Sequence, residues 1–266
     1  MKKFWGFLLV IVLMTSCGEY QSLLKSNDYN LVYKKAIEYY NKGDYQRAMN
    51  LLDGVRSVFV GQAKAQNIAY YRAFCSYNMK DYQIASDLFK QFIQTYPERS
   101  FAEECLYMMG FCDYKASPKP RLDQQVTEKA IREFQLYLSR YPYSMRKDKV
   151  NTYMDEMRDK LSYKAYLSAK NYYLREHYKA AVISLQNCLK DYPGSKYREE
   201  IMYMLFVSKY QMAVNSVEDK KVERYNNARE EYYYFADEYP NSRYAADVKK
   251  MYEDIEAYLE NYKFED

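Results

Sequence analysis

Side chains that could carry out catalysis are scarce in this chain. Its one histidine, His177, lies in the polar segment Arg175-Glu176-His177-Tyr178. We find no glycine-rich phosphate loop, no Gly-x-Ser-x-Gly, no His-Glu-x-x-His and no EF-hand spacing. A lone histidine in a turn is usually a solvated polar residue. The sequence therefore predicts that the protein is not an enzyme, with no catalytic residues and no metal site.

Carboxylates and thiols have structural explanations as well. Glu103-Glu104 and Glu199-Glu200 stand where helices are expected to start, and carboxylates there favour the helix dipole. Glu103 also follows Ser100 by three residues, as in a capping box. The internal cysteines form no Cys-x-x-Cys pair. Disulfides are possible in an exported protein, but we interpret these residues as small hydrophobes on helix faces: Cys75, Cys105, Cys112 and Cys188.

Covalent modification is the one chemistry that the sequence favours. Lys2-Lys3 precede an apolar run over residues 4–14, which is too short to span a bilayer and is typical of a signal peptide. The run ends in Thr15-Ser16-Cys17, which resembles the bacterial lipobox, although Met14 stands where Leu is usual. The resemblance implies that residues 1–16 are removed and that Cys17 receives diacylglyceryl and N-acyl groups. The alternative is an ordinary secretory signal with a chance cysteine.

Composition limits the fold and the partners. Glycine (7) and proline (6) are scarce, which argues against an all-β fold with many tight turns. Tyrosine is abundant, at 35 of 266 residues, and suits half-wet surfaces because it combines apolar area with a hydroxyl. The net charge of +4 is small and the signs are mixed, with no basic block of the kind that binds nucleic acid.

Two patterns recur along the chain. The first is Tyr-x-x-small-x-x-x-Tyr, in which only the fifth copy lacks the small residue: Tyr33-Ala36-Tyr40, Tyr70-Ala73-Tyr77, Tyr107-Gly110-Tyr114, Tyr166-Ala169-Tyr173 and Tyr203-Phe206-Tyr210. The second is an alanine followed four residues later by a large apolar residue, at Ala48, Ala85, Ala130, Ala181 and Ala228. Offsets of three, four and seven lie on one helix face, so each pair of patterns predicts a pair of packed helices.

These offsets resemble the tetratricopeptide repeat (TPR), which has small residues at positions 8 and 20 and proline at position 32. The resemblance implies an all-α solenoid of five TPR-like helix pairs with a C-terminal capping helix. We expect a lipidated tether over residues 17–28, repeats 1–3 over 29–143, an extended connecting helix over 144–162, repeats 4–5 over 163–240 and the cap over 241–266. A flexible charged linker is the alternative for 144–162.

Turn chemistry gives finer predictions. Gly43 is expected in the left-handed conformation that ends a helix, and Asp44 and Asp81 are expected to cap the next helices. Longer turns are expected in repeat three, around Ser117-Pro118-Lys119-Pro120, and in repeat five, around Val217-Glu218-Asp219-Lys220. Tyr-Pro-x-Ser, as in LKDYPGSKY, is interpreted as punctuation in which Ser195 caps the following helix.

Ten tyrosines fall at TPR positions 5 and 12. The family resemblance implies that these first-helix positions line a concave groove for a peptide or a partner protein, and tyrosine suits such surfaces. The alternative is that the rings only fill gaps between stacked repeats. The candidate groove residues are Tyr33, Tyr40, Tyr70, Tyr77, Tyr107, Tyr114, Tyr166, Tyr173, Tyr203 and Tyr210.

The lipobox, the segment Tyr39–Tyr45, the run Ala165–Tyr192 and the long inter-repeat helix together resemble the BamD family, also called YfiO. The resemblance implies a periplasmic scaffold held at the inner leaflet of the outer membrane by its lipid alone. It further implies that the C-terminal repeats bind a BamA-like barrel-inserting subunit and that the N-terminal repeats hold unfolded outer-membrane proteins. We expect the latter contact at Tyr33, Tyr40, Tyr70 and Tyr77.

Two other functions stay open at this point. The chain could be a different TPR adaptor lipoprotein of the cell envelope, or a carbohydrate-binding accessory lipoprotein, since exposed tyrosines also stack on sugars. Some surface-exposed glycan binders carry an acidic run after the lipid cysteine. Here the segment Gly18-Glu19-Tyr20-Gln21 holds a single acid, which favours the periplasmic side.

Overall fold

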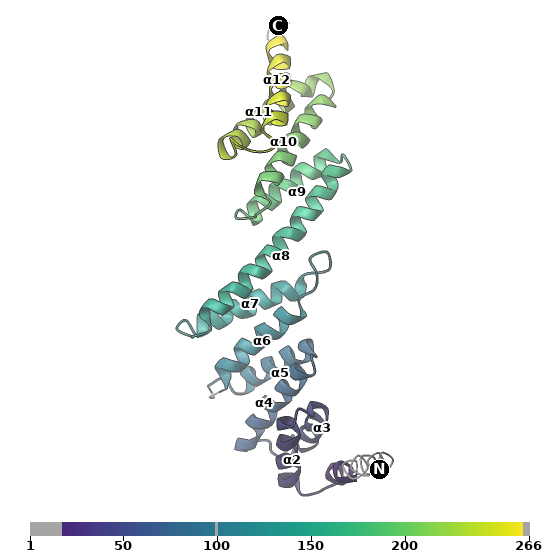
Figure 1. Cartoon of the computed structure of the whole chain (residues 1–266), viewed down its shortest axis with the longest axis vertical. Helices are drawn as coiled ribbons and strands as arrows, with labels where there is room; N and C mark the ends of the chain where they lie inside the picture. Colours follow the sequence, from purple (N-terminus) through teal and green to yellow (C-terminus); the bar gives the residue numbers. More distant parts are fainter. Residues whose placement is uncertain (1–17, 99–100, 263–266) are drawn as a thin grey trace, which may run out of the picture. The chain divides into compact units, whose positions relative to one another are not determined.

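The computed structural model describes residues 18–98 and 101–262, which form helices joined by turns, without a strand in those ranges (Figure 1). The predicted all-α repeat fold is confirmed. A short helix over residues 18–24 comes first. The helices that follow are α2 (Tyr29–Asn41), α3 (Tyr45–Val55), α4 (Ala63–Asn78), α5 (Tyr82–Thr95), α6 (Ala102–Ala116), α7 (Gln125–Arg140), α8 (Lys147–Leu174), α9 (Tyr178–Asp191), α10 (Arg198–Val214), α11 (Glu218–Glu238) and α12 (Ala245–Tyr262).

The chain divides into two compact units. Among the described residues, unit 1 holds those up to 119 and 123–157, and unit 2 holds 120–122 and those from 158 onward. We call α2, α4, α6, α8, α10 and α12 the A helices, and α3, α5, α7, α9 and α11 the B helices. Helix α8 contributes its first part to unit 1 and its remainder to unit 2, so most of the predicted connecting segment lies within one helix.

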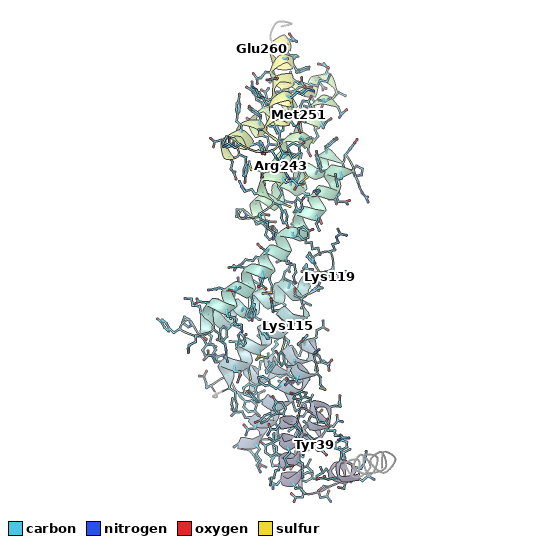
Figure 2. All side chains as sticks on the ribbon, viewed as in Figure 1. Tyr39, Lys115, Lys119, Arg243, Met251 and Glu260 are labelled. Atoms are coloured by element: carbon cyan, nitrogen blue, oxygen red, sulfur yellow. The ribbon has the colours of Figure 1, made fainter. Side chains whose placement is uncertain are left out.

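In unit 1 the small residues of both patterns allow close helix packing. Ala36, Ala48, Ala73, Ala85 and Ala130 are all fully buried. At Gly110 a Cβ atom would lie 2.9 Å from Cδ1 of the buried Phe134, so the approach of α7 to α6 requires glycine there. Side chains project from both the A and the B helices (Figure 2).

The start of unit 1 also includes part of the predicted tether. Tyr20 and Leu23, in the helix over residues 18–24, are buried in one apolar cluster with Val32 of α2 and Leu51 of α3. The Tyr20 hydroxyl accepts a hydrogen bond of 3.0 Å from the Asn50 amide. These residues are therefore part of the folded unit. Cys17, the predicted lipidation site, lies outside the described residues.

Unit 2 repeats the same packing with one change. Ala169, Ala181 and Ala228 are fully buried, as their counterparts are in unit 1. The small position of repeat five is occupied by Phe206, which is also fully buried and packs 6.2 Å from the Tyr232 ring, centroid to centroid. The larger side chain at this position is thus accommodated in a contact between two aromatic rings.

The turns within repeats agree with the predicted chemistry. Gly43 has φ +80° in the turn before α3, and the Asp44 carboxylate accepts a 3.2 Å hydrogen bond from the Arg47 backbone N–H. Lys80 and Glu176 occupy the same left-handed position before α5 and α9, with φ of 67° and 60°. Asp81 is the N-cap residue of α5, although its side chain makes no capping hydrogen bond.

Two turn predictions are wrong. Ser195 does not cap α10, because the N-cap residue is Tyr197. The Ser195 hydroxyl instead accepts a 3.3 Å hydrogen bond from the Tyr197 backbone N–H. The turn is closed by a hydrogen bond from the Ser195 backbone N–H to the Tyr192 carbonyl. Repeat five has no long turn either, since α10 ends at Val214 and α11 already starts at Glu218. Without proline or glycine, and with two acids favouring a helix start, the extra residues lengthen the helices.

Repeat three does have its predicted long turn, because Pro118 and Pro120 keep the chain non-helical between α6 and α7. The expected capping box at α6 cannot be described, since Ser100 lies outside the described residues; the N-cap is Phe101. The four internal cysteines are free and buried, which confirms their interpretation as small apolar residues.

Gly43 gives a test of the turn geometry. We expect Gly43→Ala to lower the free energy of unfolding by about 1 kcal/mol, because a Cβ atom is strained at φ +80°. Gly54, which is exposed near the end of α3 with nothing within 4 Å of its Cβ position, is the matched control. Gly54→Ala should raise stability by roughly 0.5 kcal/mol. Urea denaturation followed by circular dichroism would contradict the assignment if both changes had the same sign.

Candidate functional site

The ten candidate tyrosines all lie on A helices, and none is exposed. Tyr107 and Tyr166 are buried, and the other eight are half-buried. Little of the first two rings is therefore available to a ligand. The eight half-buried rings present part of their surface to solvent.

In unit 1 these rings link each A helix to the next. Tyr40 of α2 contacts Tyr71 of α4 with 4.9 Å between ring centroids. Tyr70 of α4 lies 4.4 Å from the ring of Phe101, the N-cap of α6. Tyr114 of α6 stacks at 4.4 Å on Tyr153 of α8.

The remaining candidates of unit 1 make similar contacts. The Lys64 ammonium lies 5.7 Å from the centroid of the Tyr33 ring. The ring centroids of Tyr77 and Phe111 are 6.2 Å apart. The Arg146 guanidinium lies 4.9 Å from the centroid of the Tyr107 ring. At Tyr33 and Tyr107 the partner from the next repeat is therefore a cation, whereas at Tyr77 it is an aromatic ring.

Unit 2 continues the pattern with closer stacking. Tyr166 and Tyr197 stack with 4.4 Å between centroids and 10° between planes. Tyr203 and Tyr244 stack at 4.0 Å and 10°. Each pair joins an A helix to the residue at or just before the start of the next one. We call these contacts in both units, between consecutive A helices, the A-helix ladder.

Several ladder hydroxyls end on carboxylates. The hydroxyl of Tyr70 donates to Glu104 over 2.8 Å, that of Tyr114 to Glu156 over 2.5 Å, and that of Tyr210 to Asp254 over 3.2 Å. The hydrogen bond to Glu156, followed by burial, raises the pKa of Tyr114 to about 12. Burial and the nearby Asp254 carboxylate likewise raise the pKa of Tyr210 to about 12. These hydroxyls therefore remain protonated donors at neutral pH.

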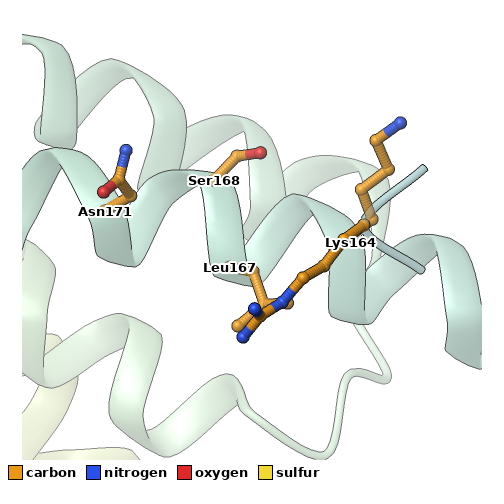
Figure 3. A pocket seen from close by; sticks show the side chains of 5 residues that line it. Lys164, Leu167, Ser168 and Asn171 are labelled. Atoms are coloured by element: carbon orange, nitrogen blue, oxygen red, sulfur yellow. The ribbon is translucent and has the colours of Figure 1, made fainter. Parts of the chain in front are cut away.

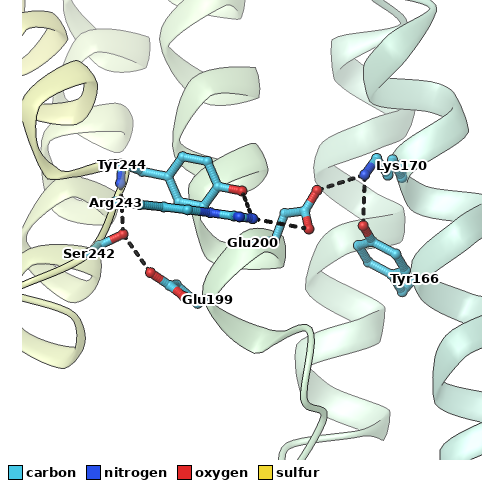
Figure 4. A network of polar contacts seen from close by, with 7 residues as sticks. All are labelled: Tyr166, Lys170, Glu199, Glu200, Ser242, Arg243 and Tyr244. Carbon is cyan, nitrogen blue, oxygen red and sulfur yellow. Dashed lines mark hydrogen bonds and ion pairs between the residues drawn. The ribbon is translucent and has the colours of Figure 1, made fainter.

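A polar network in unit 2 connects three A helices (Figure 4). Glu200 of α10 accepts a 2.7 Å bond from the Lys170 ammonium of α8, which also donates to the Tyr166 hydroxyl over 2.8 Å. On its other side Glu200 lies 3.9 Å from the Arg243 guanidinium. The adjacent Glu199 accepts a 2.6 Å bond from the Ser242 hydroxyl, in the turn before α12.

Unit 1 contains the same network, built on α6. Glu104 accepts from the Tyr70 hydroxyl of the preceding A helix and lies 3.9 Å from Arg146, just before the next one. Glu103 accepts a 2.7 Å bond from the Ser144 hydroxyl. Each Glu-Glu pair therefore contacts the A-helix regions on both sides of it.

Sequence reasoning missed this role, because it assigned the Glu-Glu pairs only to the helix dipole. A signal was present: α6 and α10 share the motif Glu-Glu-x-x-Tyr-Met, at Glu103–Met108 and Glu199–Met204. Serines of the Tyr-Pro-x-Ser turns were assigned to capping, and the bonds of Ser144 and Ser242 to these carboxylates depend on tertiary packing.

Unit 1 also buries a second polar cluster, between α5, α6 and α7. The Lys129 ammonium lies 2.9 Å from Asp113 and 3.7 Å from Glu133, and the Ser86 hydroxyl donates to Asp113 over 2.9 Å. One Glu133 oxygen is buried without a hydrogen-bond partner. Burial, and then the hydrogen bond with Asp113, raises the pKa of Glu133 to about 8.

A hollow of about 670 Å³ lies in unit 2 among α9, α10 and α11. Its lining includes His177, Ile183, Met212 and Arg224, and Ile183 is 56% exposed. A neighbouring hollow of about 270 Å³ shares Met212 and Arg224. We call the two together the α9–α11 groove. It combines apolar and cationic groups, and the sequence had singled out only His177, as a solvated turn residue.

Another hollow of unit 2, of about 400 Å³, follows α8. Lys164, Leu167, Ser168 and Asn171 lie along one stretch of that helix (Figure 3). The Lys164 ammonium donates to the Leu122 carbonyl over 2.7 Å, so this cation already has a partner.

The described residues contain neither a metal-binding cluster nor a membrane-spanning helix. Over residues 18–98 and 101–262, no three His, Cys, Asp or Glu side chains are grouped closely enough to hold a metal ion. Nor do the described helices include one with the length and apolar character needed to cross a bilayer.

The ladder predicts how its tyrosines respond to mutation. Tyr203→Ala should lower the free energy of unfolding by about 2 kcal/mol, because it removes the ring stacked on Tyr244, while Tyr203→Phe keeps the stack and should cost about 1 kcal/mol or less. Urea denaturation measures both. Equal losses for the two variants would show that the hydroxyl, and not the ring, carries the interaction.

Glu133 predicts a pH dependence. Its pKa is raised in the folded state above the ordinary 4.5, so its favourable contribution is present below about pH 4.5 and is lost as the pH rises through about 8. We expect Glu133→Gln to raise the free energy of unfolding above that of the unmodified chain by roughly 1 to 3 kcal/mol more at pH 8 than at pH 5. Glu128→Gln, at an exposed position of the same helix, should show no such trend. A flat difference between Glu133→Gln and the unmodified chain would contradict this assignment.

Two solved structures align with most of the chain at low sequence identity. No curated protein matches the chain. A TPR repeats protein from Bacteroides fragilis aligns with 13% identity and a TM-score of 0.42, covering 87% of this chain and 99% of that one. The TPR2AB domain of yeast Sti1, in complex with pHSP90, aligns with 14% identity and a TM-score of 0.39, covering 86% and 98%.

A family comparison is more specific. The model of the YfiO family, described as an outer membrane lipoprotein, matches residues 25–200 and again residues 164–265. The two matches together take in nearly all of the described chain, and they include both Glu-Glu-x-x-Tyr-Met networks. The chain therefore belongs to the YfiO family of outer membrane lipoproteins.

Proposed function

We propose that this protein is a periplasmic scaffold for the assembly of β-barrel outer-membrane proteins, held at the inner leaflet of the outer membrane by lipid on Cys17. The family match over residues 25–200 and 164–265 carries the proposal. The lipobox Thr15-Ser16-Cys17 supports the anchor. Several acyl chains would hold the protein stably, since each buried CH₂ contributes about 0.8 kcal/mol.

The α9–α11 groove is our candidate for the contact with a BamA-like barrel-inserting subunit. It lies in the C-terminal repeats, and Ile183, a large apolar residue of its lining, is 56% exposed. Exposed apolar residues surrounded by polar groups such as Arg224 and Asn215 have the composition of a protein interface.

Unfolded outer-membrane proteins are the proposed ligands of the N-terminal repeats. Tyr33, Tyr40, Tyr70 and Tyr77 are half-buried in the ladder, so each presents part of a ring while its position is fixed by packing. Fixed aromatic surface loses little entropy on binding, which suits an extended peptide that ends in an aromatic residue. We propose a binding function with no catalytic step and no contact with nucleic acid.

Co-purification from envelope extract tests the proposal. We expect the barrel-inserting subunit to be captured with the intact protein and to be reduced about tenfold or more by Ile183→Glu, because the change places a charge in the apolar part of the groove. Ile84→Glu is a matched control, since Ile84 lies on B helix α5 of unit 1 and is also 56% exposed.

Two results would contradict the proposal at different levels. Capture of no barrel-assembly subunit by the unmodified protein would overturn the scaffold function. Capture that Ile183→Glu and Ile84→Glu reduce equally, or not at all, would leave the function in place but remove the groove as its site. Circular dichroism of both variants checks that the helices are retained.

A further inference from the structure

Two large apolar side chains project fully into solvent from the turn between α7 and α8, in unit 1. Tyr143 is 98% exposed and Met145 is 103% exposed, above every other large hydrophobic residue that the structure describes. We call these two residues the 143–145 tip. Single exposed apolar residues are ordinary on protein surfaces, but two such side chains flanking one residue need an explanation.

Ser144 holds the tip in place. Its hydroxyl donates to Glu103 over 2.7 Å and also bonds the Tyr137 hydroxyl, so its side chain points into the unit. Its backbone N–H bonds the Tyr141 carbonyl over 3.1 Å, which closes the turn. Because Ser144 is fixed inward, the side chains on either side of it are directed outward. The tip is therefore presented by an ordered turn.

The same turn occurs twice in unit 2, which gives an internal comparison. The Ser195 and Ser242 N–H groups bond the carbonyls of Tyr192 and Tyr239 over 3.0 and 3.1 Å, as Ser144 bonds Tyr141. The residues flanking those serines are not apolar: Gly194 and Lys196 in the first turn, Asn241 and Arg243 in the second. The turn therefore folds without an apolar tip, and folding does not explain Tyr143 and Met145.

The charges around the tip are mainly positive. Arg140 and Arg146 flank it, at 3.1 Å from Glu98 and 3.9 Å from Glu104, so these two cations are paired within the unit. The exposed residues that follow are Lys147, Asp148 and Lys149, which carry a net positive charge toward solvent. Tyrosine, methionine and arginine are the residue types enriched at the centres of protein interfaces.

We propose that the 143–145 tip is a docking point for a protein that offers an apolar pocket bordered by carboxylates. The pocket would take the Tyr143 ring and the Met145 side chain, and its carboxylates would meet Lys147 and Lys149. This surface lies on unit 1, and Tyr143, Met145, Lys147 and Lys149 belong neither to the lining of the α9–α11 groove nor to the ladder tyrosines. It does not depend on the proposed function.

The pattern of charge favours a protein over a lipid surface. The Glu98 side chain is 89% exposed, and Asp148 is exposed between the two lysines. An anionic bilayer presents one sign of charge across the whole contact, so it would repel both acids while attracting the lysines. A protein surface can place carboxylates and donors separately, opposite the groups that each one fits.

Photo-crosslinking in intact cells tests the proposal. Benzoylphenylalanine is placed at position 143 of the full chain, and in a matched control at Asn241, the equivalent position of the last Tyr-Pro-x-Ser turn. We expect a protein adduct from position 143 and none from position 241. Mass spectrometry should map the crosslinked segment to an acidic surface with an apolar pocket. Met145→Ser, and separately Lys147→Glu with Lys149→Glu, should each reduce the adduct about tenfold.

Four results would overturn the proposal. They are no adduct above the position 241 control, an adduct with lipid alone, an adduct with a second copy of this chain, and a protein adduct that neither set of changes reduces. Met145, Lys147 and Lys149 are exposed, so these variants should retain the helical circular dichroism signal and the thermal midpoint of the unmodified chain.

Discussion

Stacking between consecutive A helices is the interaction on which both units depend. In a solenoid each repeat contacts only its neighbours, so stability is approximately a sum of repeat and interface contributions. Here the A-helix side of those interfaces is built from tyrosine rings at centroid distances as short as 4.0 Å, between Tyr203 and Tyr244. Each such contact removes apolar area from water and adds ring–ring attraction, while the hydroxyl stays free to reach a polar partner.

Ring stacking alone does not fix how far one helix lies along the next, because apolar contact has little directionality. The Glu-Glu pairs supply that direction. Glu200 holds Lys170 on one side and lies near Arg243 on the other, while Glu199 accepts from Ser242. Charge-assisted bonds of this kind are short and geometrically selective. A similar arrangement on α6 serves unit 1, where Glu104 accepts from Tyr70 and Glu103 accepts from Ser144, and both units use the serine of a Tyr-Pro-x-Ser turn.

Local sequence predicted the features that local physics controls. The buried alanines, the left-handed Gly43 and the proline-containing turn of repeat three follow from spacing and backbone preference, and the structure confirms them. The role of Ser144 could not be predicted, since its partner Glu103 is 41 residues away and their meeting depends on how α6 and α8 pack. The longer turn predicted for repeat five is wrong for a related reason. The repeat pattern shows that residues were added there, but it does not show that residues without a helix breaker extend the helix.

This use of tyrosine bears on where ligands can bind. Tyr107 and Tyr166 are buried by the helices that they join, so the ladder offers a ligand only the uncovered parts of the half-buried rings. Side chains that hold no repeat together are freer to meet a partner. Ile183 in the α9–α11 groove, with Tyr143 and Met145 on their fixed turn, expose apolar area that the fold does not use. Recognition by a protein built this way should therefore use the uncovered parts of the half-buried rings together with exposed apolar side chains, such as Ile183 and Tyr143, that the packing does not need.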